Sequence, residues 1–480
     1  MPDAGTCFPR GWRLAIVGAS LVLGSCGTPG PREQTGKAVA VPAAWQNHGT
    51  APGGRLDTAA LATWWTLFND PVLDELITGA LRSSPDVRTA RSRIAQYRAL
   101  RGVQRAALFP SVTASVSGGG TQTRGKYTAV TANGAAQGES YGASLDAGWQ
   151  VDLFGLQRQN VDAASADLAQ NEELFYGVEV SLAAEVALAY VTLRSAEAQL
   201  AVVQRSLGTR LETAQLTQWR EQAGTGNALD TQQAVSTLEQ VRASIPALQL
   251  AIAQTTNQLT VLSGRTPGSL DALLSPPRSV PEAAAGLATG IPAETLRQRP
   301  DVRAAERGVE AAFARTASAR RQRYPALNLT GSLGVEALKA RRLFSPDATV
   351  ASLLGSLTAP VFEAGRIRET ITVQTELQKQ SLTAYEATVL TALSEVENAL
   401  VATQRHGERL ATLARAVTAA REAATLSALQ FQAGQVDLLA SLEAQRTLLD
   451  LEQLAVTTTA DRAGAYVQLY KALGGGWSHL

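Results

Sequence analysis

Residue types that usually carry covalent or metal chemistry are few in this 480-residue chain and lie far apart. The three histidines, His48, His406 and His479, are separated by long stretches, so neither a histidine base nor a histidine metal site is indicated. The sequence contains no Gly-x-Ser-x-Gly turn and no glycine-rich phosphate loop that ends in lysine. We therefore expect no enzymatic activity, no catalytic residue and no metal.

Cys26 is the one residue whose neighbours specify a covalent modification. Arg10 and Arg13 precede an apolar run at 14–23, which has the length of a secretion signal and is too short to span a bilayer. The run leads into Leu-Gly-Ser-Cys26, which resembles the bacterial lipobox, whose cysteine is diacylated and becomes the new N-terminus. Two acyl chains anchor a protein stably. Because Gly27 rather than aspartate follows, we expect the outer membrane; the alternative is an ordinary secreted protein with a stray thiol.

The sequence therefore predicts a signal peptide at 1–25, then a lipidated N-terminal segment with a first short helix at 26–84, and no cofactor besides the lipid on Cys26. Cys7 leaves with the signal, so the mature chain can form no internal disulfide. The chain carries 43 Lys and Arg against 42 Asp and Glu, and the signal holds two arginines and one aspartate, so the mature charges balance. This balance argues against a nucleic-acid partner.

The chain contains an internal duplication, and each copy holds the elements that could position functional residues. Pro-Asp-Val-Arg at 85–88 recurs at 300–303, and Gln-Ala-Gly at 222–224 recurs at 432–434, at an offset five residues shorter. The change of offset falls in a stretch that is typical of a hairpin loop, where insertions are tolerated. Internal repetition fixes the architecture. The sequence predicts two tandem structural repeats and a linker: 85–264, 265–299 and 300–480.

Each repeat contains a long, proline-free stretch in which apolar residues step by three and four, as in a coiled coil. A helix over 155–220 would be roughly 100 Å long, which no compact core needs. Two shorter helices stacked end to end could flank it. Pro246 is expected to interrupt and kink the second of them. The predicted helices are 85–107, 155–220 and 227–264 in the first repeat, and an opening helix, 366–430 and 436–473 in the second.

Between the helices, apolar and polar residues alternate with the period of a β-strand. Tyr141, Leu145 and Trp149 alternate with Asp146 and Gln150. Such strands suit an outer-membrane barrel with a wet interior, although a half-buried soluble sheet gives the same pattern. The predicted strands are about 111–121, 140–153, 326–335 and 349–361. After the signal we expect no hydrophobic stretch long enough for a transmembrane helix.

Four strands per chain are too few for a barrel, because about eight leave an interior only just filled by side chains. An open sheet edge is forbidden in lipid. If the strands lie in the membrane, several chains must therefore share one barrel. Three chains would give twelve strands, although the sequence does not itself specify three.

Six segments of the chain carry a resemblance to a known family. They are Trp-Trp-Thr-Leu-Phe-Asn-Asp-Pro-Val-Leu at 64–73, Phe-Pro at 109–110, Trp-Gln-Val-Asp-Leu-Phe-Gly at 149–155, 290–306, Pro-Val-Phe-Glu-Ala-Gly-Arg at 360–366 and 469–477. These segments resemble the outer-membrane factor family of the TolC and OprM type, in its NodT-type lipoprotein branch. The resemblance implies a homotrimer with a twelve-stranded β-barrel and a long α-helical coiled-coil barrel, so that the fold is mainly α with a small β part. It also implies docking to a periplasmic adaptor (membrane fusion) protein and an inner-membrane pump of the resistance-nodulation-division class.

In this family, the turns that reverse the long helices form the periplasmic tip, where the tunnel narrows and the adaptor docks. The alternative is that these turns only connect helices. Acidic residues past the second turn ring the aperture in relatives, but here Ala440 occupies one of those positions and departs from the pattern. The resemblance implies a docking tip at Gly224, Thr225, Gly226, Asn227, Gly434, Gln435 and Val436, and an aperture ring of Asp230, Asp437 and Glu443.

The acidic residues have a simpler interpretation, since carboxylates at the start of a helix are favoured by the helix dipole. For the whole chain, the first hypothesis is an outer-membrane exit duct of a tripartite efflux pump that conducts small molecules, with a role in multidrug resistance. The outer-membrane component of a type I secretion system and a lipid-anchored periplasmic coiled-coil scaffold are the alternatives. The sequence does not name the cargo.

Overall fold

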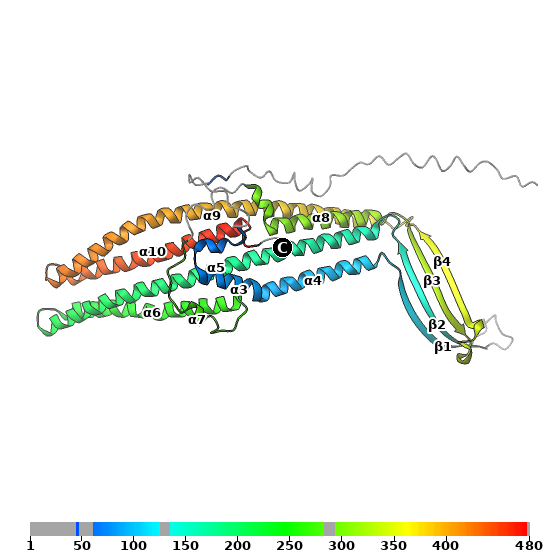
Figure 1. Ribbon diagram of the computed structural model, residues 1–480, viewed down its shortest axis with the longest axis horizontal. Coiled ribbons are helices and arrows are strands. Elements are labelled where there is room, and N and C mark those ends of the chain that lie inside the picture. The colour runs from blue at the N-terminus through cyan, green and yellow to red at the C-terminus, as the bar shows by residue number, and fades with distance from the viewer. Residues whose placement is uncertain (1–44, 48–60, 125–134, 283–292, 478–480) are drawn as a thin grey trace, which may run out of the picture.

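The protein, in this computed structural model, is an elongated helical body with a four-stranded sheet set at an angle to one end (Figure 1). The structure describes residues 45–47, 61–124, 135–282 and 293–477. Cys26 and the expected signal lie outside the described residues, and lipidation stays a prediction. The expected fold class, mainly α with a small β part, is confirmed.

The two repeats contain the same elements with the same helix lengths. The opening helix has 22 residues in both repeats, the long helix 67 and the returning helix 35. Equal lengths are what an internal duplication produces. The elements of the first repeat are α4 (Pro85–Ala106), β1 (Ser111–Arg124), β2 (Ala135–Val151), α5 (Leu156–Gln222) and α6 (Ala228–Leu262), and those of the second are α8 (Pro300–Arg321), β3 (Ala326–Ala337), β4 (Thr349–Thr358), α9 (Arg366–Gln432) and α10 (Leu438–Ala472).

Element ends differ from the expected ones for local reasons. The last strand ends at Thr358 rather than 361, two residues before Pro360, which has no N–H to pair. Helix α10 begins at Leu438 because Asp437 is its N-cap, and Asn227 caps α6 in the same way. The second strand begins at Ala135 rather than 140, since its pairing with β1 extends to Arg124.

The expectation that Pro246 interrupts its helix is wrong, whereas the expected kink stays a prediction. Helix α6 continues from Ala228 to Leu262 with Pro246 inside it. A proline removes only one backbone hydrogen bond, here the one to the Arg242 carbonyl. Helix α6 lies along α5 for its length (Figure 1), so tertiary packing holds it together.

The shorter helices meet end to end at mid-body. Ser83, the last residue of α3 (Pro71–Ser83), donates from Oγ to the Ser263 carbonyl at 2.6 Å, which joins the start of α4 to the end of α6. Gly264 has φ +64°, and a Cβ there would lie 2.4 Å from the Ser83 oxygen, so only glycine fits. In the second repeat, Arg299 Nη1 donates to the Ala472 carbonyl at 2.7 Å, at the junction of α8 and α10.

The main core lies beside these junctions and joins the two ends of the described chain. Trp64, in the 3₁₀ helix η2 (Trp64–Phe68), is fully buried and stacks on Tyr470 of α10 at a centroid distance of 5.4 Å. The Gly476 N–H donates to the Leu61 carbonyl at 2.9 Å. Two short elements, α7 (Asp271–Leu274) and η3 (Ala293–Gln298), lie in the connection between the repeats.

The expectation of no long apolar stretch after the signal needs correction. Helix α5 contains an 18-residue window of mean hydropathy 1.5, so it passes a length-and-composition test for a membrane span. Half of that window is buried inside the protein. Helix α5 packs against α3, α4, α6, α8 and α10. Buried residues of its apolar stretch belong to the main hydrophobic core.

Candidate channel wall and helical tip

The register of the sheet places the apolar residues of all four strands on one face. Strand order is β1-β2-β3-β4, and every pair is antiparallel. Leu145 lies opposite Ala114 on β1 and opposite Leu333 on β3, whereas Leu329 lies opposite Trp149. Because side chains alternate across a strand, these paired residues share a face. The residues of this apolar face are Val112, Ala114, Val116, Tyr141, Ala143, Leu145, Ala147, Trp149, Val151, Leu327, Leu329, Leu333, Val335, Ala351, Leu353 and Leu357.

The opposite face is mostly polar and hydrogen-bonded within itself. Ser115 and Ser144 lie 2.8 Å apart between their hydroxyl oxygens, and Ser144 donates to Asp146 Oδ2 at 2.8 Å. Val350 and Leu354 are the large apolar exceptions on this face. The sheet has one apolar and one polar face, none of its described side chains is buried, and it has no partner layer within the described chain. Such a sheet suits lipid on one side and water on the other.

Both edge strands of the sheet are open. Strand β1 pairs only with β2 and β4 pairs only with β3, so each has one unpaired side among the described residues. In lipid, unpaired backbone N–H and C=O groups cost several kcal/mol each. The sheet therefore has to be completed by further strands if it lies in a membrane.

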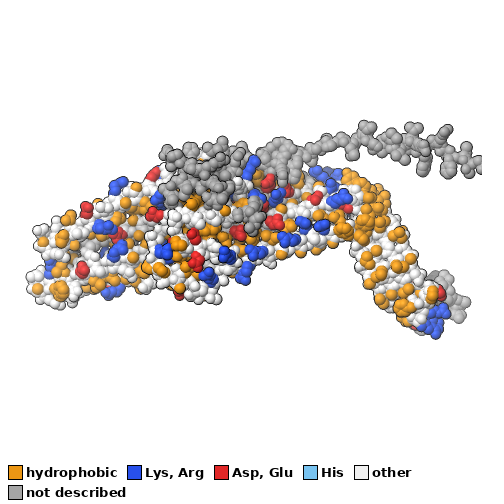
Figure 2. Space-filling model, in the orientation of Figure 1, with side chains coloured by type: hydrophobic (Ala, Val, Ile, Leu, Met, Phe, Trp, Pro, Cys, Tyr) orange, Lys and Arg blue, Asp and Glu red, His pale blue; other side chains and the backbone are white. Residues whose placement is uncertain are grey.

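A belt of exposed aromatic and apolar residues marks the junction between the sheet and the helices. Phe109 precedes β1, and Phe362 follows β4. Phe154, just after β2, stacks on Tyr324 just before β3, at a centroid distance of 5.0 Å. Figure 2 shows hydrophobic side chains gathered over this junction. Aromatic belts of this kind lie at membrane–water interfaces.

At the opposite end of the body, each helix hairpin turns through a left-handed glycine, Gly224 with φ +70° and Gly434 with φ +72°. In the first tip, the N–H groups of both Thr225 and Gly226 donate to the Arg220 carbonyl. A Cβ at Gly226 would lie 3.1 Å from the Glu221 nitrogen, so a larger residue there would require a small shift of the turn.

The second tip repeats one of these contacts, since Gln435 N–H donates to the Gln430 carbonyl at 2.8 Å as Thr225 N–H does to the Arg220 carbonyl. The two tips differ at the next residue. Val436, the counterpart of Gly226, is half-buried and packs against a small apolar cluster between the hairpins. We call this cluster the tip cluster; its buried members are Ala214, Ala234, Leu238, Phe431, Leu438 and Leu442.

Arg220 ties the two tips together. Its Nη2 donates to the Phe431 carbonyl at 3.0 Å and to the Gln432 carbonyl at 2.9 Å, and its guanidinium lies 4.6 Å from the centroid of the Phe431 ring. These two carbonyls lie in the last turn of α9, where a cation is favoured by the helix dipole.

The structure places the three expected aperture residues near the tips but in different settings. Asp437 Oδ1 accepts from the Ala440 N–H at 2.9 Å, which is a capping contact. Asp230 accepts from Asn227 Nδ2 at 3.1 Å, whereas its own N–H donates to Asn227 Oδ1 at 2.8 Å. Glu443 is exposed and lines a groove further along α10. Within one chain they form no cluster, and their role in an aperture stays a prediction.

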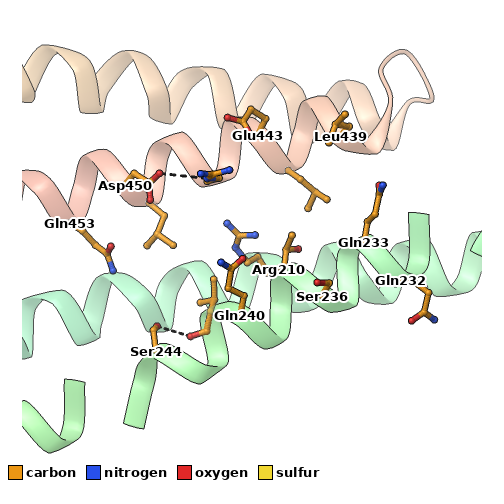
Figure 3. A pocket seen from close by; sticks show the side chains of 15 residues that line it. Arg210, Gln232, Gln233, Ser236, Gln240, Ser244, Leu439, Glu443, Asp450 and Gln453 are labelled. Carbon is orange, nitrogen blue, oxygen red and sulfur yellow. Dashed lines mark hydrogen bonds and ion pairs between the residues drawn. The ribbon is translucent and has the colours of Figure 1, made fainter. Parts of the chain in front are cut away.

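The groove lies between α6 and α10, with α5 at its floor, and has a volume of about 600 Å³ (Figure 3). Arg210 projects from α5 into it and is only 4% exposed, and its Nε has no hydrogen-bond partner among the described residues. Burial lowers the pKa of Arg210, an effect that nearby Asp450 opposes and Arg446 increases.

Arg210 and Arg220 were missed from the sequence, although the repeat holds a weak signal for both. Their counterparts in the second repeat are Ala420 and Gln430, so each arginine occurs in one repeat only. Asymmetry between duplicated positions can mark a contact that joins the repeats. The partners themselves, more than 200 residues away for Arg220, could not be read from spacing.

An amphipathic sheet with two open edges, joined to helices of about 100 Å, defines the class of outer-membrane channels with a helical extension. The chain belongs to the outer membrane efflux protein family, whose members it matches over residues 76–265 and 291–475. The expected family is thereby confirmed, as are the outer-membrane location and the efflux function.

Proteins that are similar to the chain in sequence or in structure support this family. The chain is 31% identical to the toluene efflux pump outer membrane protein TtgF of Pseudomonas putida, over 87% of this chain and 86% of that one. It is 31% identical to the pyoverdine export outer membrane protein OpmQ of Pseudomonas aeruginosa, over 97% of each chain. Among solved structures, the outer-membrane channel OprN superposes with a TM-score of 0.83 and 31% identity, over 92% of this chain and 98% of that one.

Proposed function

We propose that three copies of this chain, anchored by lipid at Cys26, form the exit duct of a tripartite efflux pump. The observation that carries the proposal is the register, which gives the sheet one apolar face and leaves β1 and β4 unpaired. Pairing β4 of one copy with β1 of the next would leave no edge in lipid. Three copies give twelve strands, enough for a barrel with an open interior.

The helices continue the duct on the side of the sheet that faces the periplasm. Because α5 and α9 each have 67 residues, the body reaches about 100 Å beyond the aromatic belt. The duct is passive, and its energy comes from an inner-membrane pump of the resistance-nodulation-division class. Among relatives, TtgF is named for toluene and OpmQ for pyoverdine. We propose small organic molecules as the cargo, chosen by the inner-membrane partner.

The two tips are the proposed docking surface for a periplasmic adaptor. Leu229 and Leu439 occupy equivalent positions in the first turns of α6 and α10, and both are exposed. An exposed leucine at the same place in each repeat gives a ring of six apolar side chains in a trimer. An α-helical adaptor tip with complementary apolar residues fits such a ring.

The test combines Leu229→Asp with Leu439→Asp, and uses Leu250→Asp, an equally exposed leucine far from the tips, as the control. We expect the double variant to lose crosslinking to the adaptor and to leave cells as susceptible to organic toxicants as a deletion strain. The purified double variant should keep its single-channel conductance. Normal crosslinking and resistance in the double variant would remove the tips from docking.

A further inference from the structure

The β3–β4 loop at the far end of the sheet is folded rather than extended. It contains the 3₁₀ helices η4 (Ala340–Arg342) and η5 (Pro346–Ala348). The Arg342 N–H donates to the Lys339 carbonyl at 2.9 Å, and Ser345 donates from both N–H and Oγ to the Arg342 carbonyl. Ala348 is buried. The loop therefore presents its side chains from a defined backbone.

Three cations and two large apolar side chains share this loop. Lys339, Arg341 and Arg342 are exposed, and none of them forms an ion pair with any described residue. Leu338 is 76% exposed and Phe344 is 87% exposed. Figure 2 shows Lys and Arg side chains gathered at this free end of the sheet. The acidic residues of the segment, Glu336 and Asp347, lie at its two ends and make no ion pair with the three cations.

The length of the strands places this loop at one surface of a bilayer. Strand β3 has 12 residues, which span about 40 Å along the strand. With the usual tilt of an outer-membrane strand, this is about 30 Å along the membrane normal, the thickness of the hydrocarbon core. The aromatic belt at the helical junction lies at the inner surface. The loop then lies among the headgroups of the outer leaflet.

We propose that Lys339, Arg341 and Arg342 bind a phosphate-bearing lipid headgroup of the outer leaflet, while Leu338 and Phe344 insert beside its acyl chains. This inference rests on the proposed membrane orientation of the sheet. Arginine presents a planar fork that matches phosphate oxygens, and lysine adds a point charge. Exposed apolar side chains next to cations are typical of surfaces that contact anionic lipid. In a trimer the site occurs three times around the rim.

The probe is a fluorescent phosphatidic acid, compared with the matching fluorescent diacylglycerol, which lacks the phosphate. Binding to the full-length protein in non-ionic detergent is measured by anisotropy. We expect the wild type to bind the phosphate lipid at least tenfold more tightly than the diacylglycerol. The variant K339Q/R341Q/R342Q should lose that preference, and Leu338→Ser with Phe344→Ser should weaken the binding of both lipids.

The matched control is R93Q/R98Q/R105Q, which removes three exposed arginines from α4 in the helical body. This control should bind the phosphate lipid as the wild type does. Equal loss in the control would show general charge attraction and overturn the proposal. Displacement of the lipid by inorganic phosphate alone at low concentration, with no effect of the apolar substitutions, would show a free-anion site instead and also overturn it. Conductance is recorded for every variant, so a failure of lipid binding in a conducting channel leaves the duct intact.

Discussion

The middle of the body and the tip of the hairpins are held together in different ways. At mid-body, Trp64, Tyr190 and Tyr470 are fully buried within one large core that joins both repeats and the chain segment before α3. At the tip, the tip cluster has only six buried residues, and the Arg220 contacts end on backbone carbonyls. Regions with few buried contacts open at lower free energy than cores do. This difference indicates that the mid-body core, which we call the frame, is rigid. The hairpin ends around the tip cluster, which we call the mouth, move more easily.

Buried polar groups occur in both regions. At mid-body, Tyr190 donates from its hydroxyl to Asp70 at 2.6 Å, and Arg299 contacts both Asp301 and Glu395 at 2.7 Å. Burial raises the pKa of Tyr190 to about 12, with the hydrogen bond to Asp70 as the second cause. Near the tip, Arg210 keeps an unpartnered Nε in the groove. Unpartnered buried atoms are not confined to the tip, because Nε and Nη2 of the fully buried Arg194 at mid-body also lack a partner among the described residues.

The largest expected effect comes from the mid-body core. Replacing Trp64 with alanine removes a fully buried side chain that stacks on Tyr470. We expect the free energy of unfolding to fall by about 3–5 kcal/mol. Denaturant titration followed by circular dichroism measures the change, with Trp219→Ala, an exposed tryptophan near the tip, as the control. Equal losses for the two substitutions would contradict the division between frame and mouth.

The next-largest loss of stability is expected from the hydrogen bond between Tyr190 and Asp70 in the same core. Tyr190→Phe leaves a buried Asp70 oxygen without its donor, and we expect a loss of about 1–3 kcal/mol at neutral pH. The folded-state pKa of Tyr190 is raised, so its contribution is complete below pH 10 and declines as the pH rises towards 12. The difference in stability between wild type and variant should therefore shrink over that range. A difference that stays constant would exclude the linkage.

A substitution at the tip should change conductance rather than stability. Arg220→Met removes both hydrogen bonds to the end of α9 and keeps an unbranched apolar chain beside Phe431. We expect a larger open-channel population in planar bilayers and a change in unfolding free energy of less than about 1 kcal/mol. Arg242→Met, which removes an exposed pair with Glu239, serves as the control. If both variants conduct as the wild type does, Arg220 does not hold the mouth.

The smallest effect separates charge from capping at Asp437. Asparagine is as good an N-cap as aspartate, so Asp437→Asn should keep stability, whereas Asp437→Ala should cost about 1 kcal/mol. If Asp437 belongs to an aperture ring, both variants should lower cation selectivity, because a ring of carboxylates favours cations. Combining Asp437→Ala with Glu443→Ala should also raise conductance. Ion selectivity is measured from reversal potentials. If selectivity is unchanged in every variant, Asp437 acts only as the N-cap of α10.

The regular features of this fold could be predicted because they repeat. Duplicated motifs revealed the two repeats, and alternation along 141–153 revealed a face that the register of all four strands then extended. Features that depend on distant partners could not be predicted. The need for glycine at position 264 comes from the close approach of Ser83, which is distant in sequence. The contacts of Arg220 depend on where the last turn of α9 lies in space. The interruption predicted at Pro246 is absent because packing against α5 stabilises the helix although one backbone hydrogen bond is missing.

The most direct test of the central claim is the mass of the protein extracted from outer membranes in mild detergent, measured by native mass spectrometry. The open edges of β1 and β4 require neighbouring copies, and the proposed twelve-stranded barrel predicts three copies in one particle. The same particles should give discrete conductance steps in a planar bilayer. A monomer that stays dispersed in detergent-free buffer once its acyl groups are removed, with both faces of the sheet open to aqueous label, would contradict the account.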